Sequence, residues 1–174
     1  MQRKRSLYNK IKDSLTTSSG IFIAIILTGL RFFKNVMQFQ YSGGFYNKMS
    51  KVFIIDDDSI HQRIAQIMIE KHKLFDDYTS FTEAEKAIIY IKDHKKDANA
   101  LPDVILLDLN MPVIDGWDFL DLFENIREEL KKIIRIFIVT SSVDEKDILK
   151  SQSYSSVCGF ISKPLSPEII RNTI

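Results

Sequence analysis

The chain has 174 residues, of which 45% are hydrophobic and 27% charged, with six glycines and four prolines. This length fits one ordinary domain or one small domain with an appendage. The composition excludes collagenous, disordered and low-complexity proteins. The single cysteine, Cys158, excludes an intramolecular disulfide framework and argues against a cysteine-rich metal site. It also fits a reducing compartment, so we expect the chain in the cytoplasm.

The formal net charge of +1 averages two segments of opposite charge. Residues 1–50 carry eight Lys or Arg and one acid, a net charge of +7, whereas residues 51–174 carry 16 bases and 22 acids, a net charge of −6. Such asymmetry predicts a segment boundary. Nucleic-acid binding needs clustered Lys and Arg, so we expect none from the acidic part. Any membrane contact is expected only through residues 1–48.

Residues 1–48 form a basic and hydrophobic segment that has several interpretations. Its apolar run, Ile21–Leu30, has ten residues, whereas a membrane-spanning helix needs roughly 20. The run resembles the centre of a signal peptide, but no small-residue cleavage site follows it at Arg31. Three interpretations stay open. The segment lies upstream of a true start at Met49, or is disordered; it forms a membrane-associated basic helix; or it is a cleaved signal. We expect the folded domain at residues 49–174.

From residue 51 onward, short apolar runs alternate with stretches of helical spacing. The expected order is strand 52–55, helix 60–72, strand 78–81, a helix opened by a capping box of Thr82 and Glu85, strand 104–107, helix 118–130, strand 133–139, helix 143–150, strand 159–161 and helix 166–174. Apolar strands without polar alternation are typical of a parallel sheet covered by helices. The pattern therefore predicts an α/β fold, a doubly wound five-stranded parallel sheet with helices on both faces.

Ligands of such sheets bind beyond the carboxyl ends of the strands, so the residues that follow each apolar run are the candidates. An acid at a helix start is often a cap, which is our interpretation of Asp58. A cap does not explain why three further acids, a hydroxyl and a basic residue follow the runs. The set consists of Asp56, Asp57, Asp108, Thr140 and Lys163.

Convergence of these carboxylates would be costly without a cation. Two carboxylates about 5 Å apart repel by roughly 3 kcal/mol at an effective dielectric near 20. Oxygen ligands of high charge favour a hard cation, and Mg²⁺ commonly binds one or two carboxylates together with phosphate oxygens. A carboxylate beside such a metal can also accept a phosphoryl group as a nucleophile. Lys163 would then offset charge on the transferred group, and Thr140 would donate a hydrogen bond to it.

The combination of these residues resembles the receiver domain of two-component response regulators. The likeness covers about residues 50–174 and is carried by Val52–Ser59, Val104–Gly116, Ile138–Ser141 and Gly159–Pro164. The most specific block reads Asp-x-Asn-Met-Pro-x-x-Asp-Gly. The resemblance implies a flavodoxin-like receiver fold and a phosphoprotein that acts in phosphorelay signal transduction.

The resemblance also implies a phosphoacceptor and a set of metal ligands. Asp108 would accept a phosphoryl group from the phosphohistidine of a histidine kinase or phosphotransfer protein, in a reaction that depends on Mg²⁺. Asp57 would bind the metal directly, and Asp56 would complete the acid pair, partly through water. Asp108 itself and the backbone carbonyl of Asn110 would be further metal ligands.

Three residues beyond the metal site would respond to the phosphoryl group. The resemblance implies that Thr140 hydrogen-bonds a phosphoryl oxygen and that Lys163 pairs with it. Phe160 matches the aromatic switch position of the family, but it lacks the hydroxyl of the commoner tyrosine, and a plain core aromatic is an equal interpretation. Ser141, a small residue, should leave the phosphate accessible. His61 and the other two histidines are predicted to be solvated.

Eleven residues follow Lys163, so we expect a short last helix, no effector domain, and output through an unidentified downstream protein. The expected activity is that of a signalling switch with intrinsic self-phosphorylation and dephosphorylation only, and not of an enzyme. One alternative is a Mg²⁺-dependent phosphatase of the haloacid dehalogenase type that uses Asp56 and Asp58, although it leaves the Asp108 block unexplained. Another is a receiver fragment of a longer regulator or hybrid kinase.

Overall fold

The computed structural model describes residues 51–173. The chain divides into two units, residues 1–47 and 48–174, and all described residues lie in the second. The interpretations of residues 1–48 fall outside the described residues. Between residues 51 and 173, none of the helices has the length and apolar character that crossing a membrane requires.

The described residues form five strands that alternate with helices. The elements are β1 Lys51–Ile55, α3 Ser59–His72, β2 Asp77–Phe81, α4 Ala84–Asp93, β3 Val104–Asp108, α5 Gly116–Glu124, the 3₁₀ helix η1 Arg127–Glu129, β4 Arg135–Thr140, α6 Glu145–Ser151, β5 Val157–Ser162 and α7 Pro167–Thr173. All strands are parallel, in the order β2-β1-β3-β4-β5. The predicted fold class is confirmed.

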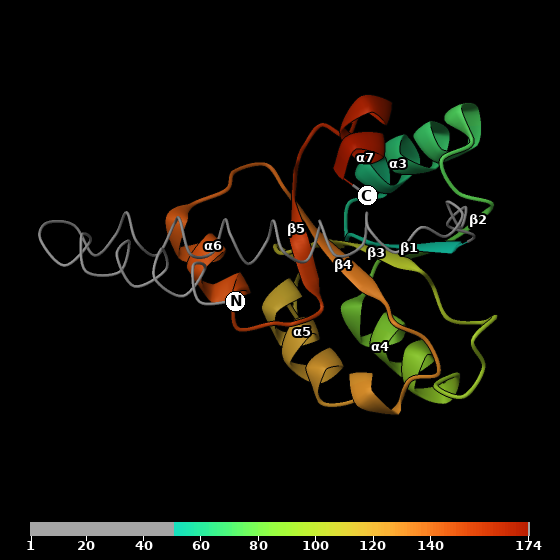
Figure 1. Cartoon of the computed structure of the whole chain (residues 1–174). Coiled ribbons are helices and arrows are strands. Elements are labelled where there is room, and N and C mark those ends of the chain that lie inside the picture. Colours follow the sequence, from blue (N-terminus) through green and yellow to red (C-terminus); the bar gives the residue numbers. More distant parts are fainter. Residues whose placement is uncertain (1–50, 174) are drawn as a thin grey trace, which may run out of the picture. The chain divides into compact units, whose positions relative to one another are not determined.

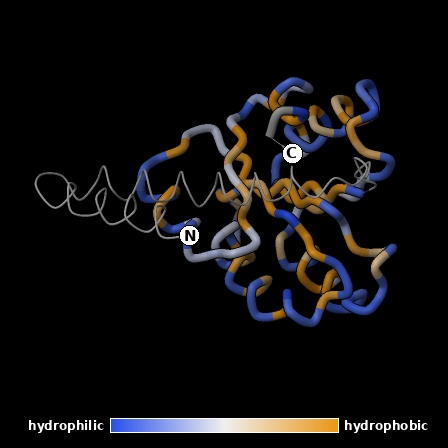
Figure 2. The backbone as a smooth tube through the Cα atoms, in the orientation of Figure 1, coloured by the Kyte–Doolittle hydropathy of each residue, from blue (hydrophilic) through white to orange (hydrophobic). Residues whose placement is uncertain are grey.

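Both faces of the sheet are covered, as the unalternated apolar strands require (Figure 1). Successive residues of a strand point to opposite faces, so Phe53 and Ile55 of β1 pack with α4 and α5, whereas Val52 and Ile54 pack with α3 and α7. Figure 2 shows the hydrophobic residues concentrated along the central strands. Burial on both faces fixes the position of the strands that carry the candidate functional residues.

The strand register brings the candidate functional residues to one edge of the sheet. In β1 and β3, Ile55 pairs with Leu107, so the residues that follow them are neighbours. Further along the sheet, Asp108 pairs with Val139 of β4, and Thr140 pairs with Ser162 of β5. From β1 the chain adds β2 on one side of the sheet and then β3, β4 and β5 on the other. The boundary between β1 and β3 is therefore the switch point, where doubly wound sheets bind their ligands.

Two predicted helix boundaries are wrong. The capping box of Thr82 does not form, because α4 begins a residue later and its N-cap is Glu83, which makes no side-chain capping hydrogen bond. The helix predicted at 118–130 begins at Gly116 instead, because Asp115 accepts a hydrogen bond from the backbone N–H of Asp118 in a true capping box. This helix ends at Glu124 and is followed by η1.

Candidate functional site

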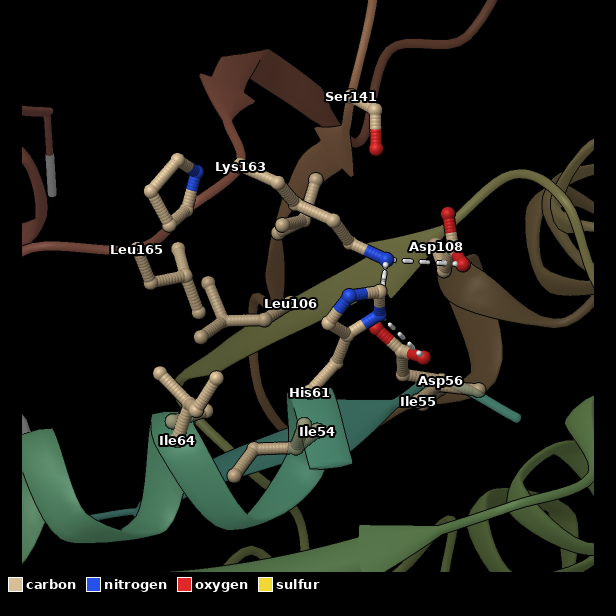
Figure 3. Close-up of a pocket in the computed structure, with 13 residues that line it drawn as sticks. Ile54, Ile55, Asp56, His61, Ile64, Leu106, Asp108, Ser141, Lys163 and Leu165 are labelled. Atoms are coloured by element: carbon tan, nitrogen blue, oxygen red, sulfur yellow. Dashed lines mark hydrogen bonds and ion pairs between the residues drawn. The ribbon is translucent and has the colours of Figure 1, made fainter. Parts of the chain in front are cut away.

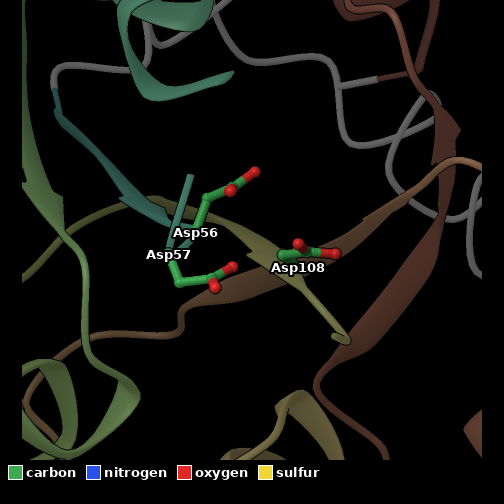
Figure 4. A group of neighbouring side chains, drawn as sticks. All are labelled: Asp56, Asp57 and Asp108. Atoms are coloured by element: carbon green, nitrogen blue, oxygen red, sulfur yellow. The ribbon is translucent and has the colours of Figure 1, made fainter. Parts of the chain in front are cut away.

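Three carboxylates gather at the carboxyl ends of β1 and β3. Asp56 and Asp57 follow the last residue of β1, and Asp108 is the last residue of β3. One oxygen of each lies within 4.8 Å of the others (Figure 4). Asp56 and Asp108 are buried, whereas Asp57 is exposed. The structure therefore brings together the acids that the sequence singles out.

Lys163, which follows β5, lies among the buried acids (Figure 3). Its Nζ is 2.8 Å from Asp56 Oδ2 and 3.0 Å from Asp108 Oδ2. An ammonium in this position offsets the repulsion between the two carboxylates. Burial by itself lowers the pKa of Lys163, but the hydrogen bonds to Asp56 and Asp108 raise this pKa above its ordinary value. Lys163 is therefore a fixed positive charge beside Asp108.

His61 lies at the same site. Its side chain is 40% exposed, in keeping with the prediction that it is solvated, but its contacts with the acids and Lys163 were not predicted. Its Nδ1 is 3.1 Å from Lys163 Nζ and 3.6 Å from one carboxylate oxygen each of Asp56 and Asp58. Figure 3 shows the ring projecting from the first turn of α3 toward the acids. The sequence offered one signal, the spacing of three residues from Asp58, which puts both side chains on one side of the helix start.

The position of Asp56 is fixed by hydrogen bonds from the start of α3. The buried Gln62 donates from Nε2 to the backbone carbonyl of Asp56 at 2.7 Å, and the N–H of Asp58 donates to Asp56 Oδ1 at 2.9 Å. Asp58 caps α3 by accepting from the N–H of Ile60, which lowers the pKa of the Asp58 carboxyl. The cap interpretation of Asp58 is confirmed, whereas the role of Gln62 was missed.

The loop after β3 is held close to Asp108 by Gly116. The N–H of Gly116 donates to the carbonyl of Leu109 at 3.0 Å. A Cβ on Gly116 would lie 2.5 Å from the carbonyl oxygen of Asp108 and 2.7 Å from Leu109 Cα. No side chain fits at such distances, because both atoms belong to the backbone. Gly116, the glycine of the specific sequence block, is therefore required for the packing of the loop that follows Asp108.

Asn110 stands in this loop. Its N–H donates to Asp108 Oδ1 at 3.4 Å, and its side chain is exposed. The structure thus places the Asn110 backbone beside the acid cluster, and the assignment of its carbonyl as a metal ligand stays a prediction.

The other residues expected to respond to a phosphoryl group lie on β4 and β5. Thr140 is buried, and its hydroxyl donates to the carbonyl of Ser142 at 3.0 Å. The N–H of Lys163 donates to the carbonyl of Thr140 at 2.8 Å, which ties the two strand ends together. Phe160 is half-buried and packs against the core beneath α4 and α5. Its switch role stays a prediction.

A cavity of about 290 Å³ opens beside the acid cluster (Figure 3). Ser141 lies on its wall, in agreement with an accessible site. The polar lining consists of Asp56, His61, Asp108, Ser141 and Lys163. The apolar lining is supplied mainly by Ile54, Ile64, Ala65, Leu106, Val139 and Leu165.

The donor set of the acid cluster fits a hard divalent cation. Carboxylate oxygens are the ligands that Mg²⁺ prefers, and three of them lie close enough to share one ion. Asp57 is exposed and makes no ion pair with Lys163 among the described contacts, so its oxygens are open to a metal. The arrangement can hold a cation, a nucleophilic carboxylate and a fixed ammonium side by side.

Comparison with known proteins gives one consistent result. The family described as "Response regulator receiver domain" matches residues 52–174. Chemotaxis protein CheY1 of Helicobacter pylori is 27% identical over 125 residues, which cover 71% of this chain and 93% of that protein. The probable methanogenesis regulatory protein FilR2 of Methanothrix harundinacea is 24% identical over 123 residues, covering 71% of this chain and 77% of that protein.

A solved structure agrees with this result. The two-component response regulator from Cytophaga hutchinsonii superimposes with a TM-score of 0.66 at 29% identity, covering 73% of this chain and 95% of that chain. These matches do not favour the haloacid dehalogenase alternative, because the family model that matches residues 52–174 is that of the response regulator receiver domain.

Proposed function

The chain belongs to the response regulator receiver domain family, and we propose that Asp108 is the residue on which it accepts a phosphoryl group. Receiver domains of two-component systems serve in phosphorelay signalling, and the chain shares this function. The observation that carries the assignment is the position of Asp108. It is a buried carboxylate at the strand-order switch point, beside two further acids and a lysine ammonium 3.0 Å away.

The proposed step is an in-line phosphoryl transfer. A carboxylate oxygen of Asp108 attacks the phosphorus of a phosphohistidine on a histidine kinase or phosphotransfer protein. A new O–P bond forms as the P–N bond breaks, and the donor imidazole leaves with the bonding electron pair and takes up a proton from solvent. The product is an acyl phosphate on Asp108, which water hydrolyses to inorganic phosphate and the free carboxylate.

The neighbouring residues have distinct tasks in this proposal. Asp56, Asp57, Asp108 and the carbonyl of Asn110 would hold Mg²⁺, which when bound supplies positive charge to the phosphoryl oxygens. Lys163 is already within hydrogen-bonding distance of Asp108, so a short movement brings its ammonium to a phosphoryl oxygen. Thr140 would exchange its bond to the Ser142 carbonyl for a bond to the phosphoryl group.

The signal would follow from the exchange of these bonds. Phosphorylation adds a charge of about −1.5 to −2 at a site that is already rich in acids. Movement of Thr140 and Lys163 toward the new oxygens would release contacts of β4 and β5 and allow Phe160 to repack. We propose that the domain is a switch for protein partners rather than an enzyme that turns over an external substrate. A cytoplasmic location is part of this proposal, because the single cysteine suits a reducing compartment.

The test is phosphorylation of the complete chain by acetyl phosphate, followed by intact mass measurement. The expected result is one added phosphoryl group that requires Mg²⁺, is lost in EDTA and is absent from Asp108→Asn. Asp118→Asn is the matched control, because it changes an exposed aspartate of the same loop and helix start. An adduct of equal yield in Asp108→Asn would refute the assignment, and so would an adduct that forms equally well without divalent cation.

A further inference from the structure

Gln62 is a buried polar side chain next to the acid cluster, and the proposed phosphoryl transfer gives it no task. It is the fourth residue of α3 and is 7% exposed. Its Nε2 donates to the backbone carbonyl of Asp56 at 2.7 Å, and this hydrogen bond is itself buried. A buried polar group is retained at the cost of desolvation, so the bond that satisfies it is the feature to explain.

Helix geometry accounts for the reach of Gln62. Side chains of an α-helix tilt toward its N-terminus, and long ones lie over the preceding turn. The backbone N–H of Gln62 donates to the carbonyl of Asp58 at 3.0 Å, as the first turn of α3 requires. The side-chain amide extends further back, to Asp56, six residues earlier. One residue therefore joins the start of α3 to the end of β1.

The bonded carbonyl belongs to the peptide unit between Asp56 and Asp57. A peptide unit is planar, so a hydrogen bond to its oxygen restricts the rotation of a plane that ends at the Cα atoms of both acids. On the other side, the N–H of Asp56 donates to the carbonyl of Phe81 in β2 at 3.1 Å. The backbone at Asp56 is thus held by β2 through its N–H and by Gln62 through its carbonyl.

The orientation of Asp57 depends on this backbone. In the turn that follows β1, the side-chain hydrogen bonds and ion pairs involve Asp56 and Asp58, and none of them holds the exposed carboxylate of Asp57. One oxygen of Asp57 nevertheless lies within 4.8 Å of one oxygen each of Asp56 and Asp108 (Figure 4). The peptide plane that Gln62 holds is therefore what directs Asp57 toward the cluster.

We propose that Gln62 is a positioning residue for the metal, because its hydrogen bond keeps the Asp56–Asp57 peptide in the orientation in which both carboxylates face one Mg²⁺. This inference rests on the proposed function, since it concerns the same cation. Residues that orient metal ligands from outside the site change metal affinity by about 10–100-fold when they are substituted. Gln62 would touch neither the metal nor the phosphoryl group, so its effect is on the affinity for Mg²⁺.

The experiment titrates the complete chain with MgCl₂ at constant ionic strength and without a phosphodonor. Binding is followed by the amide NMR signal of Asn110, whose N–H lies beside Asp108. Gln62→Met keeps a side chain of similar length but removes the donor, and we expect it to bind Mg²⁺ about tenfold more weakly. Gln62→Asn keeps an amide that is one methylene too short, and it should weaken binding in the same way.

Phosphorylation by acetyl phosphate provides a second measurement. Gln62→Met should require about tenfold more Mg²⁺ for half-maximal rate, in proportion to its weaker binding. At saturating Mg²⁺ its rate should equal that of the natural chain. A substitution that merely distorts the site would lower the rate at saturating Mg²⁺ as well, so the separation of the two quantities identifies a positioning role.

Gln66→Met is the matched control. Gln66 lies one turn later on α3, and its Nε2 donates to Ser80 Oγ at 2.9 Å, so the substitution removes a comparable hydrogen bond away from the acids. Its affinity for Mg²⁺ should be that of the natural chain. Equal weakening by Gln66→Met and Gln62→Met would overturn the inference, because the effect would then come from α3 as a whole.

The outcomes also separate this inference from the phosphoacceptor assignment. If Gln62→Met and Gln62→Asn fold and bind Mg²⁺ as tightly as the natural chain, the role of Gln62 is refuted and the assignment of Asp108 stands. If the natural chain shows no saturable binding of Mg²⁺, both the role of Gln62 and the proposed metal site are refuted.

Discussion

His61 Nδ1 and Lys163 Nζ lie 3.1 Å apart, although 102 residues separate them in the sequence. A lysine ammonium can only donate hydrogen bonds, so a hydrogen bond at this distance makes Nδ1 the acceptor. With Asp56 and Asp108, the imidazole provides the third acceptor for the three ammonium hydrogens of Lys163. His61 is therefore a residue that positions Lys163.

The first prediction concerns this positioning. His61→Leu removes the acceptor and should slow phosphorylation of Asp108 by acetyl phosphate roughly fivefold, the effect of one hydrogen bond of about 1 kcal/mol. His61→Gln supplies an amide oxygen in place of Nδ1 and should restore most of the rate. The measurement is the initial rate of adduct formation at saturating Mg²⁺. If the glutamine variant is as slow as the leucine variant, the ring acts by its shape and not as an acceptor.

The second prediction concerns the charge balance of the acid cluster. Lys163→Met leaves Asp56 and Asp108 buried without their cation, and removal of one partner from a buried ion pair costs about 3–5 kcal/mol. We expect a loss of unfolding free energy of about 3 kcal/mol in EDTA, measured by urea denaturation. Added Mg²⁺ should recover part of the loss, because the metal replaces the missing charge.

Lys146→Met is the control for this substitution, since it removes an exposed lysine of α6. Its unfolding free energy should change little and should not depend on Mg²⁺ beyond the natural sequence. A Lys163→Met variant that is as stable as the natural chain in EDTA would show that the buried acids are neutralised in another way.

The third prediction concerns the loop that follows Asp108. Gly116→Ala places a Cβ 2.5 Å from the carbonyl oxygen of Asp108, so the backbone around the acceptor has to move. We expect a loss of about 1–3 kcal/mol in unfolding free energy, typical of overpacking, together with slower phosphorylation of Asp108. Urea denaturation and adduct formation would be measured on the same preparation. An unchanged midpoint and rate would contradict the close approach of Gly116 to β3.

The fourth prediction concerns pH. Burial and a hydrogen bond to Asp121 at 2.8 Å raise the pKa of Tyr154 to about 12 from an ordinary value of 10. Because the folded-state pKa is the higher one, the stabilisation is complete below pH 10 and is lost as pH rises from about 10 to 12. Two units correspond to about 3 kcal/mol at most.

Tyr154→Phe tests the source of this pH dependence. The unfolding free energy of the natural chain should fall between about pH 10 and 12 more steeply than that of the variant. Absorbance at 295 nm should record one late-titrating tyrosine fewer in the variant than in the natural chain. Equal slopes in the two proteins would assign the alkaline instability to other groups.

The sequence determines the fold class because its apolar runs carry no polar alternation. Runs such as Val104–Leu107 are buried on both faces only in a parallel sheet covered by helices, and the predicted order of five strand–helix units is the observed one. Helix boundaries were less predictable. A capping box at Thr82 and one at Asp115 have the same local pattern, and only the second forms.

The sequence also predicts which residues line the carboxyl edge, since Asp56, Asp57, Asp108 and Lys163 each lie within two residues of the end of an apolar run. It does not predict His61 beside Lys163, because the contact depends on how α3 rotates as it packs on the sheet. The pattern of the sequence determines which side chains lie at the carboxyl edge of the sheet. The distances between residues that are remote in the sequence are determined by how the helices pack on the strands.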